Sequence, residues 1–254
     1  MVNRVKVTEN FSRYAHLYDK YADVQNKAAW ELACSISSGN FSRILELGCG
    51  TGNYTALLRE RFKDARIKAL DISEEMIKVA QNKLKDQDVE FTVADAEKII
   101  PAEDFDLITS NACFQWLSDL GKLLRGYAKL LPKGGRICFS IFGPRTFCEL
   151  NKALKSVLKD NSLASAYFYD SGSLKTILKD NFKSVKIDEI CYQESFANLQ
   201  GLLEKIKYSG IRGNGLSGKV YFSRGLLGKL ENAYLDRFGG IFATYQVFFC
   251  WGEK

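Results

Sequence analysis

The sequence predicts an α/β fold, in which a seven-stranded, mostly parallel sheet carries helices on both faces. Three observations predict this fold. Short apolar segments alternate with amphipathic segments between residues 43 and 142, as strands joined by helices do. A glycine-rich loop separates the first of these strands from the helix after it. Two more apolar segments lie near the end of the chain, and the 254 residues, 46% of them hydrophobic, suffice for a single domain spanning residues 1–254.

The N-terminal segment, residues 8–34, is predicted to be one helix with an aromatic face. Residues at steps of three and four share one side of a helix. Five residues follow this spacing: Phe11, Tyr14, Tyr18, Tyr21 and Gln25. We expect this helix to act as a lid on the rest of the domain.

The next segments form two strand–helix units. The first strand, residues 43–47, leads through the glycine loop into an amphipathic helix. The second strand, residues 67–70, ends at Asp71. Ser73 is placed to cap the following helix, whose acidic first turn suits the positive end of the helix dipole.

The remaining elements follow from the same signals. Strands are expected at residues 89–93, 106–110, 136–142, 184–192 and 245–251, and helices at 120–131, 146–159 and 173–180. Between the last two strands lies an insertion, residues 196–240. It holds seven glycines between residues 199 and 232, so we expect it to be poorly suited to regular structure.

Composition limits the chemistry that the chain can support. The seven cysteines include no CxxC pair, so they are expected to be reduced thiols, and with one histidine no metal site is predicted. No segment approaches the roughly 20 apolar residues that span a bilayer, and the polar N-terminal sequence lacks a signal-peptide core. A cytoplasmic protein without a membrane partner is therefore expected. The net charge of the chain is +6. Residues 199–232 hold six basic and two acidic residues, so +4 of this charge lies in that segment.

The glycine loop, Glu46-Leu47-Gly48-Cys49-Gly50-Thr51-Gly52, indicates a nucleoside cofactor. A dinucleotide GxGxxG pattern started at Gly48 would need its last glycine where the chain has Asn53, so the loop fits a GxGxG pattern better. Asp71 lies 23 residues after Gly48 at the end of a strand, where a carboxylate can accept both ribose hydroxyls. Asp95, after the third strand, can accept from an adenine amino group.

Residues 40–145 resemble the class I methyltransferases, whose fold is Rossmann-like and whose cofactor is S-adenosylmethionine. The resemblance implies that the glycine-loop backbone faces the methionine carboxylate, that Ala96 covers the adenine beside Asp95, and that Asn111 receives the methionine ammonium. The cofactor-binding residues expected on this basis are Glu46, Gly48, Cys49, Gly50, Gly52, Asp71, Ile72, Asp95, Ala96 and Asn111.

A narrower resemblance covers nearly the whole chain. Segments outside the cofactor motif are similar to the malonyl-acyl-carrier-protein O-methyltransferases of biotin synthesis: residues 11–15 with Tyr18 and residues 24–25, then 111–116, 142–150, 206–210 and 244–254. Arg145 departs from this family's pattern, in which a small residue is expected, and residues 211–214 follow it only loosely. These departures affect the substrate contacts rather than the cofactor.

The resemblance implies methyl transfer to the free carboxylate of a malonyl thioester. A carboxyl that titrates near 4 is ionised at neutral pH and needs no general base. Catalysis then consists of positioning the carboxylate and excluding water. Four residues are candidates to place it: Tyr18, Gln115, Trp116 and Arg145.

The implied partner is malonyl-acyl-carrier protein, which is acidic. Basic residues of the insertion, Arg212, Lys219 and Arg224, are candidates to dock it, although a solvated loop explains them equally well. The alternative is an O- or C-methyltransferase of a small free acid or quinone. A nucleic-acid methyltransferase is less favoured, because the chain lacks an NPPY-like tetrapeptide and an RNA-binding module. A cofactor-binding regulator without catalysis also stays open.

Overall fold

The computed structural model describes residues 4–36, 41–158, 162–209 and 223–254. Its seven strands form one sheet in the order β3-β2-β1-β4-β5-β7-β6. Their bounds are β1 Arg43–Leu47, β2 Arg66–Asp71, β3 Val89–Val93, β4 Leu107–Asn111, β5 Arg136–Phe142, β6 Ser184–Phe196 and β7 Ile241–Glu253. The first five run parallel, and β7 is antiparallel to both of its neighbours. The predicted Rossmann-like, mostly parallel sheet is therefore confirmed.

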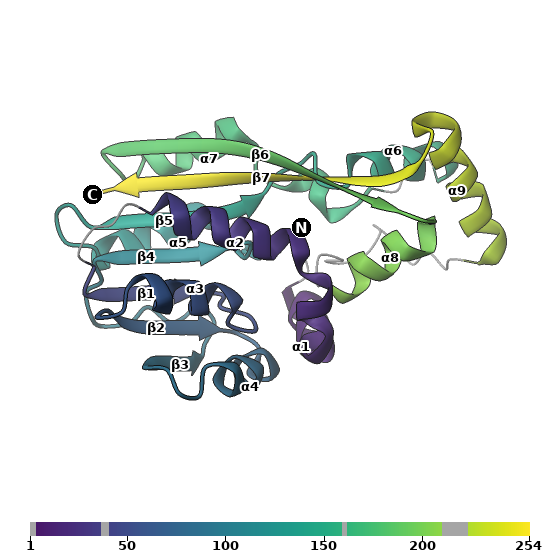
Figure 1. The fold of residues 1–254 in the computed structure, drawn as a ribbon. Coiled ribbons are helices and arrows are strands. Elements are labelled where there is room, and N and C mark those ends of the chain that lie inside the picture. The colour runs from purple at the N-terminus through teal and green to yellow at the C-terminus, as the bar shows by residue number, and fades with distance from the viewer. Residues whose placement is uncertain (1–3, 37–40, 159–161, 210–222) are drawn as a thin grey trace.

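Helices cover both faces of the sheet (Figure 1). They are α1 Arg4–Tyr21, α2 Asp23–Ser35, α3 Asn53–Arg61, α4 Glu74–Lys83, α5 Leu120–Tyr127, α6 Cys148–Val157, α7 Ser171–Lys179, α8 Leu199–Tyr208 and α9 Arg224–Phe238. The core lies in two large apolar clusters and a small third one, which contains Cys49, Ala69 and Ile77. Helices α2, α3 and α6 contribute to the first large cluster, and α5 and α7 contribute to the second. Since β1 is covered on both faces, Ile44, Leu45 and Leu47 are fully buried.

The N-terminal segment is two helices, and the prediction of one helix over residues 8–34 is wrong. Ala22 separates α1 from α2, and α1 is also kinked at Tyr14, where φ is −111° and ψ is 15°. The break lets α2 bury Val24 and Leu32 against the sheet, while α1 turns across the ends of the strands. The aromatic periodicity continues through the break, which is why the sequence pattern did not reveal it.

The insertion is more regular than its glycines suggest, because it contains α8 and α9. Asn198 caps α8 by accepting from the Gly201 N–H, and Ser223 caps α9 by accepting from the Leu226 N–H. A helical glycine costs about 1 kcal/mol, but burial of side chains such as Leu202 contributes more. Residues 210–222, which include Arg212 and Lys219, lie outside the described residues.

The last two strands extend beyond their predicted bounds and carry this insertion. Both β6 and β7 are 13 residues long, and they pair along their whole length. Figure 1 shows that the β6–β7 pair projects past the parallel strands. Helix α8 lies beside α1, at the carboxyl ends of the parallel strands. No helix in the described part of the chain is long and apolar enough to cross a bilayer.

Candidate cofactor and acceptor site

The glycine loop follows β1 and has the backbone conformation that its glycines allow. Gly48, Gly50 and Gly52 have φ values of 72°, 54° and 82°, all in the left-handed region. A Cβ atom on Gly48 would lie 2.2 Å from the Cys113 sulfur, so a side chain is excluded there. The loop therefore brings bare backbone to the carboxyl end of the sheet, next to the start of α3.

Asp71 connects the glycine loop to the end of β2. Its carboxylate accepts from the Gly50 N–H at 2.9 Å and from the Ser73 N–H at 2.8 Å. Burial raises the pKa of Asp71, while these backbone N–H groups lower it in part. A carboxylate held in this way is fixed in orientation and can still accept hydrogen bonds from a ligand, because each oxygen has two lone pairs.

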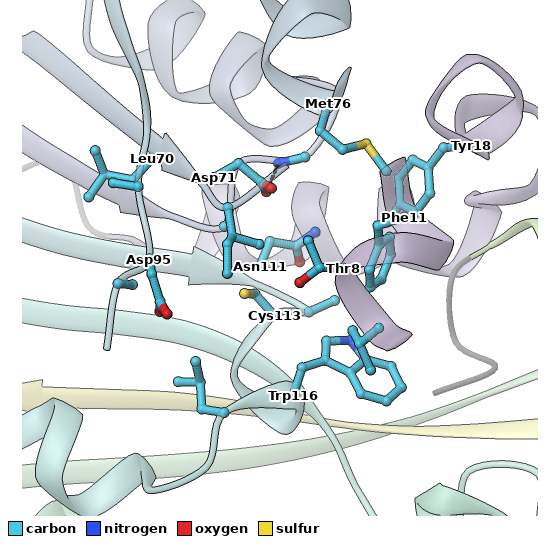
Figure 2. Close-up of a pocket in the computed structure, with 18 residues that line it drawn as sticks. Thr8, Phe11, Tyr18, Leu70, Asp71, Met76, Asp95, Asn111, Cys113 and Trp116 are labelled. Carbon is cyan, nitrogen blue, oxygen red and sulfur yellow. Dashed lines mark hydrogen bonds between the residues drawn. The ribbon is translucent and has the colours of Figure 1, made fainter. Parts of the chain in front are cut away.

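A cavity of about 820 Å³, including its open mouth, runs along this edge of the sheet. Its lining combines most of the expected cofactor residues with four residues of α1: Val7, Thr8, Phe11, Tyr18, Gly48, Gly50, Leu70, Asp71, Ile72, Met76, Ala94, Asp95, Ala96, Asn111, Ala112, Cys113, Trp116 and Leu117. Figure 2 shows Asp71 and Asp95 on one side of it and Tyr18 and Phe11 on the other.

A second hollow lies behind the glycine loop and contains buried acceptor atoms. Glu46 is 1% exposed, and neither of its carboxylate oxygens has a hydrogen-bond partner in the described part of the chain. The side-chain oxygen of Gln25 in the same lining is also unpartnered there. Burial raises the pKa of Glu46 to about 8 against a smaller lowering by the Thr55 hydroxyl, so its carboxyl is mostly protonated at neutral pH.

Asn111 lines both spaces, as do Tyr18, Gly48 and Gly50. Its amide nitrogen donates to the Gln25 carbonyl at 3.1 Å, and its side-chain oxygen accepts from the Ser140 hydroxyl at 2.7 Å. The side chain is therefore held in place. We infer that a ligand ammonium would find more unoccupied acceptors on Glu46 and Gln25 than on Asn111, and Gln25 was not expected to take part from its place in an aromatic helix face.

The lid helix α1 supplies the outer wall of the cavity. Phe11 packs at 6.1 Å from the Tyr18 ring and at 6.3 Å from the Trp116 ring. Burial is the main cause that raises the pKa of Tyr18, and the nearby carboxylates of Asp19 and Asp71 raise it further. Tyr18 therefore remains a phenol at neutral pH and can donate a hydrogen bond.

Asp19 fastens the end of the lid helix to the glycine loop. Its carboxylate accepts from the Thr51 hydroxyl at 2.5 Å and from the Asn53 amide at 3.1 Å, and it pairs with the Lys83 ammonium at 2.7 Å. These partners come from the glycine loop, α3 and α4. Sequence reasoning missed this contact because the residues are 32 to 64 positions apart.

Two candidate substrate residues do not line the cavity, and their role in binding the acceptor stays a prediction. Gln115 is buried and spans the loop after β4: its amide donates to the Ala112 carbonyl at 2.6 Å and accepts from the Phe142 N–H at 3.4 Å. Arg145 is 63% exposed at its side chain and pairs with Glu189 at 3.4 Å. Of the four candidates for holding the acceptor, only Tyr18 and Trp116 line the cavity.

The expected cofactor residues come together with one partial exception. Cys49 and Glu46 line the hollow behind the loop. Gly52 lines neither space: it is the N-cap of α3, and a Cβ atom there would lie 3.1 Å from the Ala80 Cβ of α4. In the described residues no group of His, Cys, Asp or Glu side chains is arranged to hold a metal ion.

This fold, with its glycine loop and acids at the strand ends, defines an S-adenosylmethionine-dependent methyltransferase. Residues 45–139 match the family model described as a methyltransferase domain. The chain is 38% identical to malonyl-acyl-carrier-protein O-methyltransferase 1 of Ilyobacter polytropus, covering 94% of this chain and 89% of the relative. It is 35% identical to the enzyme of the same name from Bacillus cereus, covering 98% and 97%. The chain belongs to the malonyl-acyl-carrier-protein O-methyltransferase family.

A solved structure agrees with this class. The N-methyltransferase NodS from Bradyrhizobium japonicum, in complex with S-adenosylhomocysteine, matches with a TM-score of 0.54 over 97% of this chain and 98% of that one. The two chains are 16% identical, so the likeness concerns the fold. In this chain the cradle at Gly48 and the unpartnered acid Glu46 fit a cofactor that carries an amino acid and a nucleoside.

Proposed function

We propose that the protein methylates the free carboxylate of a malonyl thioester on acyl-carrier protein, with S-adenosylmethionine as methyl donor. The product is the malonyl methyl ester from which the pimeloyl chain of biotin is built. The observation that carries this proposal is the extent of the similarity. It covers 94% and 98% of the chain in the two relatives and so includes the lid helix and the insertion, which lie outside the shared methyltransferase core.

The cofactor is proposed to span both hollows. Asp71 would accept from the ribose hydroxyls, and Asp95 with Ala96 would hold the adenine. The methionine carboxylate would face the backbone of the glycine loop, and its ammonium would lie near Glu46, Gln25 and Asn111. When bound, the cofactor supplies an electrophilic methyl group on a positively charged sulfur.

The acceptor is proposed to lie between Tyr18 and Trp116. The residues that line the cavity include no lysine, arginine or histidine in the described part of the chain. Neutral donors such as the Tyr18 phenol would orient the carboxylate, and the positive sulfur would attract it. The lid and the aromatic rings of Phe11 and Trp116 would exclude water from the nucleophile.

The carrier protein is proposed to dock on the insertion. Arg224 begins α9 and is exposed, as docking requires, and the proposal extends to Arg212 and Lys219 in the neighbouring sequence. The carrier is acidic, so these cations would accelerate its association. The names of the relatives favour this acceptor over a small free acid or a quinone.

The test is to incubate the protein with labelled S-adenosylmethionine and one acceptor at a time. Malonyl-acyl-carrier protein is expected to gain one methyl group by mass spectrometry. Acetyl-acyl-carrier protein and malonyl-carrier protein that is already esterified are expected to gain none. Methylation of the acetyl thioester would indicate carbon chemistry, and labelling of none of the acceptors would refute the proposed activity.

A further inference from the structure

A cluster of tyrosines and lysine joins the lid helix to the insertion helix α8. The Tyr208 ring packs edge-on against Tyr14 at 5.1 Å and lies 4.9 Å from the Tyr21 ring. The Lys207 ammonium lies over two of these rings, 4.7 Å from the centre of Tyr208 and 5.5 Å from that of Tyr14. It also donates to the Tyr208 hydroxyl at 3.2 Å. We call these four residues the Lys207 cluster.

Lys207 carries a positive charge that no carboxylate in the described residues neutralises. Its pKa is raised above the usual lysine value, mainly by the hydrogen bond to Tyr208, and no acidic side chain contributes. Lys205, two residues earlier, is the contrast, because it is buried and pairs with both Asp23 and Glu194. The rings of Tyr14 and Tyr208 hold the Lys207 ammonium in place, and the hydrogen bonds that raise its pKa come from tyrosine hydroxyls rather than from a carboxylate.

The Lys207 cluster adjoins the cavity on two sides. Tyr14 and Tyr21 flank Tyr18 on α1, and Tyr18 lines the cavity. On the other side the Ser209 carbonyl, two residues after Lys207, accepts from the Gln25 amide at 3.3 Å, and Gln25 lines the hollow behind the glycine loop. Lys207 therefore stands next to a cavity whose described lining has no cation of its own.

We propose that the Lys207 cluster is an anion subsite for the malonyl thioester, in which the Lys207 ammonium and a tyrosine hydroxyl bind one oxyanion of the substrate. The inference rests on the proposed function. Two groups of the substrate could provide this oxyanion, the malonyl carboxylate and the phosphodiester of the pantetheine arm, and each carries a single negative charge. Lysine and phenol donors suit both, because a charge-assisted hydrogen bond to either is stronger than a neutral one.

The experiment compares Lys207→Met, Lys207→Arg and the control Lys175→Met, an exposed lysine on α7 that lies outside the insertion. Three acceptors are used: malonyl-N-acetylcysteamine, which has only the carboxylate, malonyl-coenzyme A, which adds phosphates, and malonyl-acyl-carrier protein. We measure kcat and KM for each acceptor, the Kd for S-adenosylhomocysteine and the Tm. Lys207→Met is expected to lose about tenfold or more in kcat/KM, mainly through KM, with Kd and Tm unchanged. Lys207→Arg is expected to recover part of the loss.

The three acceptors identify the source of the anion. Loss on all three assigns the subsite to the carboxylate, and loss only on the two phosphate-bearing acceptors assigns it to the phosphodiester. The inference is overturned if Lys207→Met keeps wild-type kcat/KM on all three acceptors, if Lys175→Met loses as much, or if the loss matches a rise in the Kd for S-adenosylhomocysteine. Failure of the wild-type protein to methylate any acceptor would instead refute the proposed function.

Discussion

Binding of the cofactor is predicted to release a proton from Glu46. The carboxyl of Glu46 is buried without a partner in the described structure, and its pKa is about 8. At pH 7 it is about nine-tenths protonated. A ligand ammonium placed beside it favours the ionised form and lowers the pKa again. The affinity for S-adenosylhomocysteine should therefore rise as the pH rises towards 8.

The size of this effect follows from the pKa. If the bound state restores an ordinary glutamate pKa, the ionised fraction of the free protein sets the pH dependence, and the Kd should fall roughly fiftyfold between pH 6 and pH 8. The Glu46→Gln variant cannot ionise, so its Kd should be weaker at pH 8 and nearly flat with pH. Calorimetric titration in two buffers with different ionisation enthalpies measures the proton release directly.

A pH-independent Kd in the wild-type protein, or the same slope in Glu46→Gln, would refute this reasoning. Stability gives a second check. The folded pKa is raised, so between the ordinary glutamate value and pH 8 the folded protein binds more protons than the unfolded chain. The cofactor-free protein should therefore lose stability as the pH rises through that interval, and Glu46→Gln should lose less.

Three further changes test the site. Asp71→Asn should weaken binding of S-adenosylhomocysteine by about tenfold or more, since charge-assisted hydrogen bonds are lost; an unchanged Kd by calorimetry would place Asp71 outside the pocket. Gly48→Ala should abolish cofactor binding, because its Cβ would meet the Cys113 sulfur at 2.2 Å; full binding by a folded variant would contradict the loop geometry. Asp19→Ala should lower the Tm by a few degrees and raise the Kd for S-adenosylhomocysteine. Lys83→Met should cause only part of both effects, because it leaves the hydrogen bond from Thr51 to Asp19 intact; equal effects of the two variants would mean that the ion pair alone stabilises this contact.

The parallel core and the sheet edge that carries the cofactor residues could be expected from local signals, but the break between α1 and α2 could not. Gly48, Asp71 and Asp95 each follow an apolar segment that is predicted to be a strand. Because the carboxyl ends of parallel strands lie at one edge of a sheet, the three residues are expected to lie close together there. The break at Ala22 has no proline or glycine to mark it. It arises because α2 packs on the sheet and α1 crosses the strand ends, which is a tertiary requirement.

Two of the four acceptor candidates stay predictions. Gln115 and Arg145 came from segments that resemble the family and were candidates to hold an anion, but in the structure the Gln115 amide donates to the Ala112 carbonyl and Arg145 pairs with Glu189. The contacts of Asp19 with Thr51 and of Lys207 with Tyr14 join segments far apart in the chain. No periodicity connects such residues, so a single sequence does not reveal them.

The described lining of the cavity has no cation, which suits the proposed chemistry. Transfer of a methyl group from a sulfonium to a carboxylate consumes one positive and one negative charge, so charge decreases as the transition state forms. A buried cation against the reacting carboxylate would stabilise the reactants more than the transition state and would slow the step. Neutral donors such as the Tyr18 phenol orient the carboxylate with less of this penalty. The charge of a phosphodiester does not change during methyl transfer. If Lys207, which lies beside the cavity, binds the phosphodiester, it therefore does not stabilise the reacting carboxylate and does not slow the step. Of the two anion sources, this argument favours the phosphodiester, and loss of kcat/KM confined to malonyl-coenzyme A and malonyl-acyl-carrier protein in Lys207→Met is the result that would agree with it.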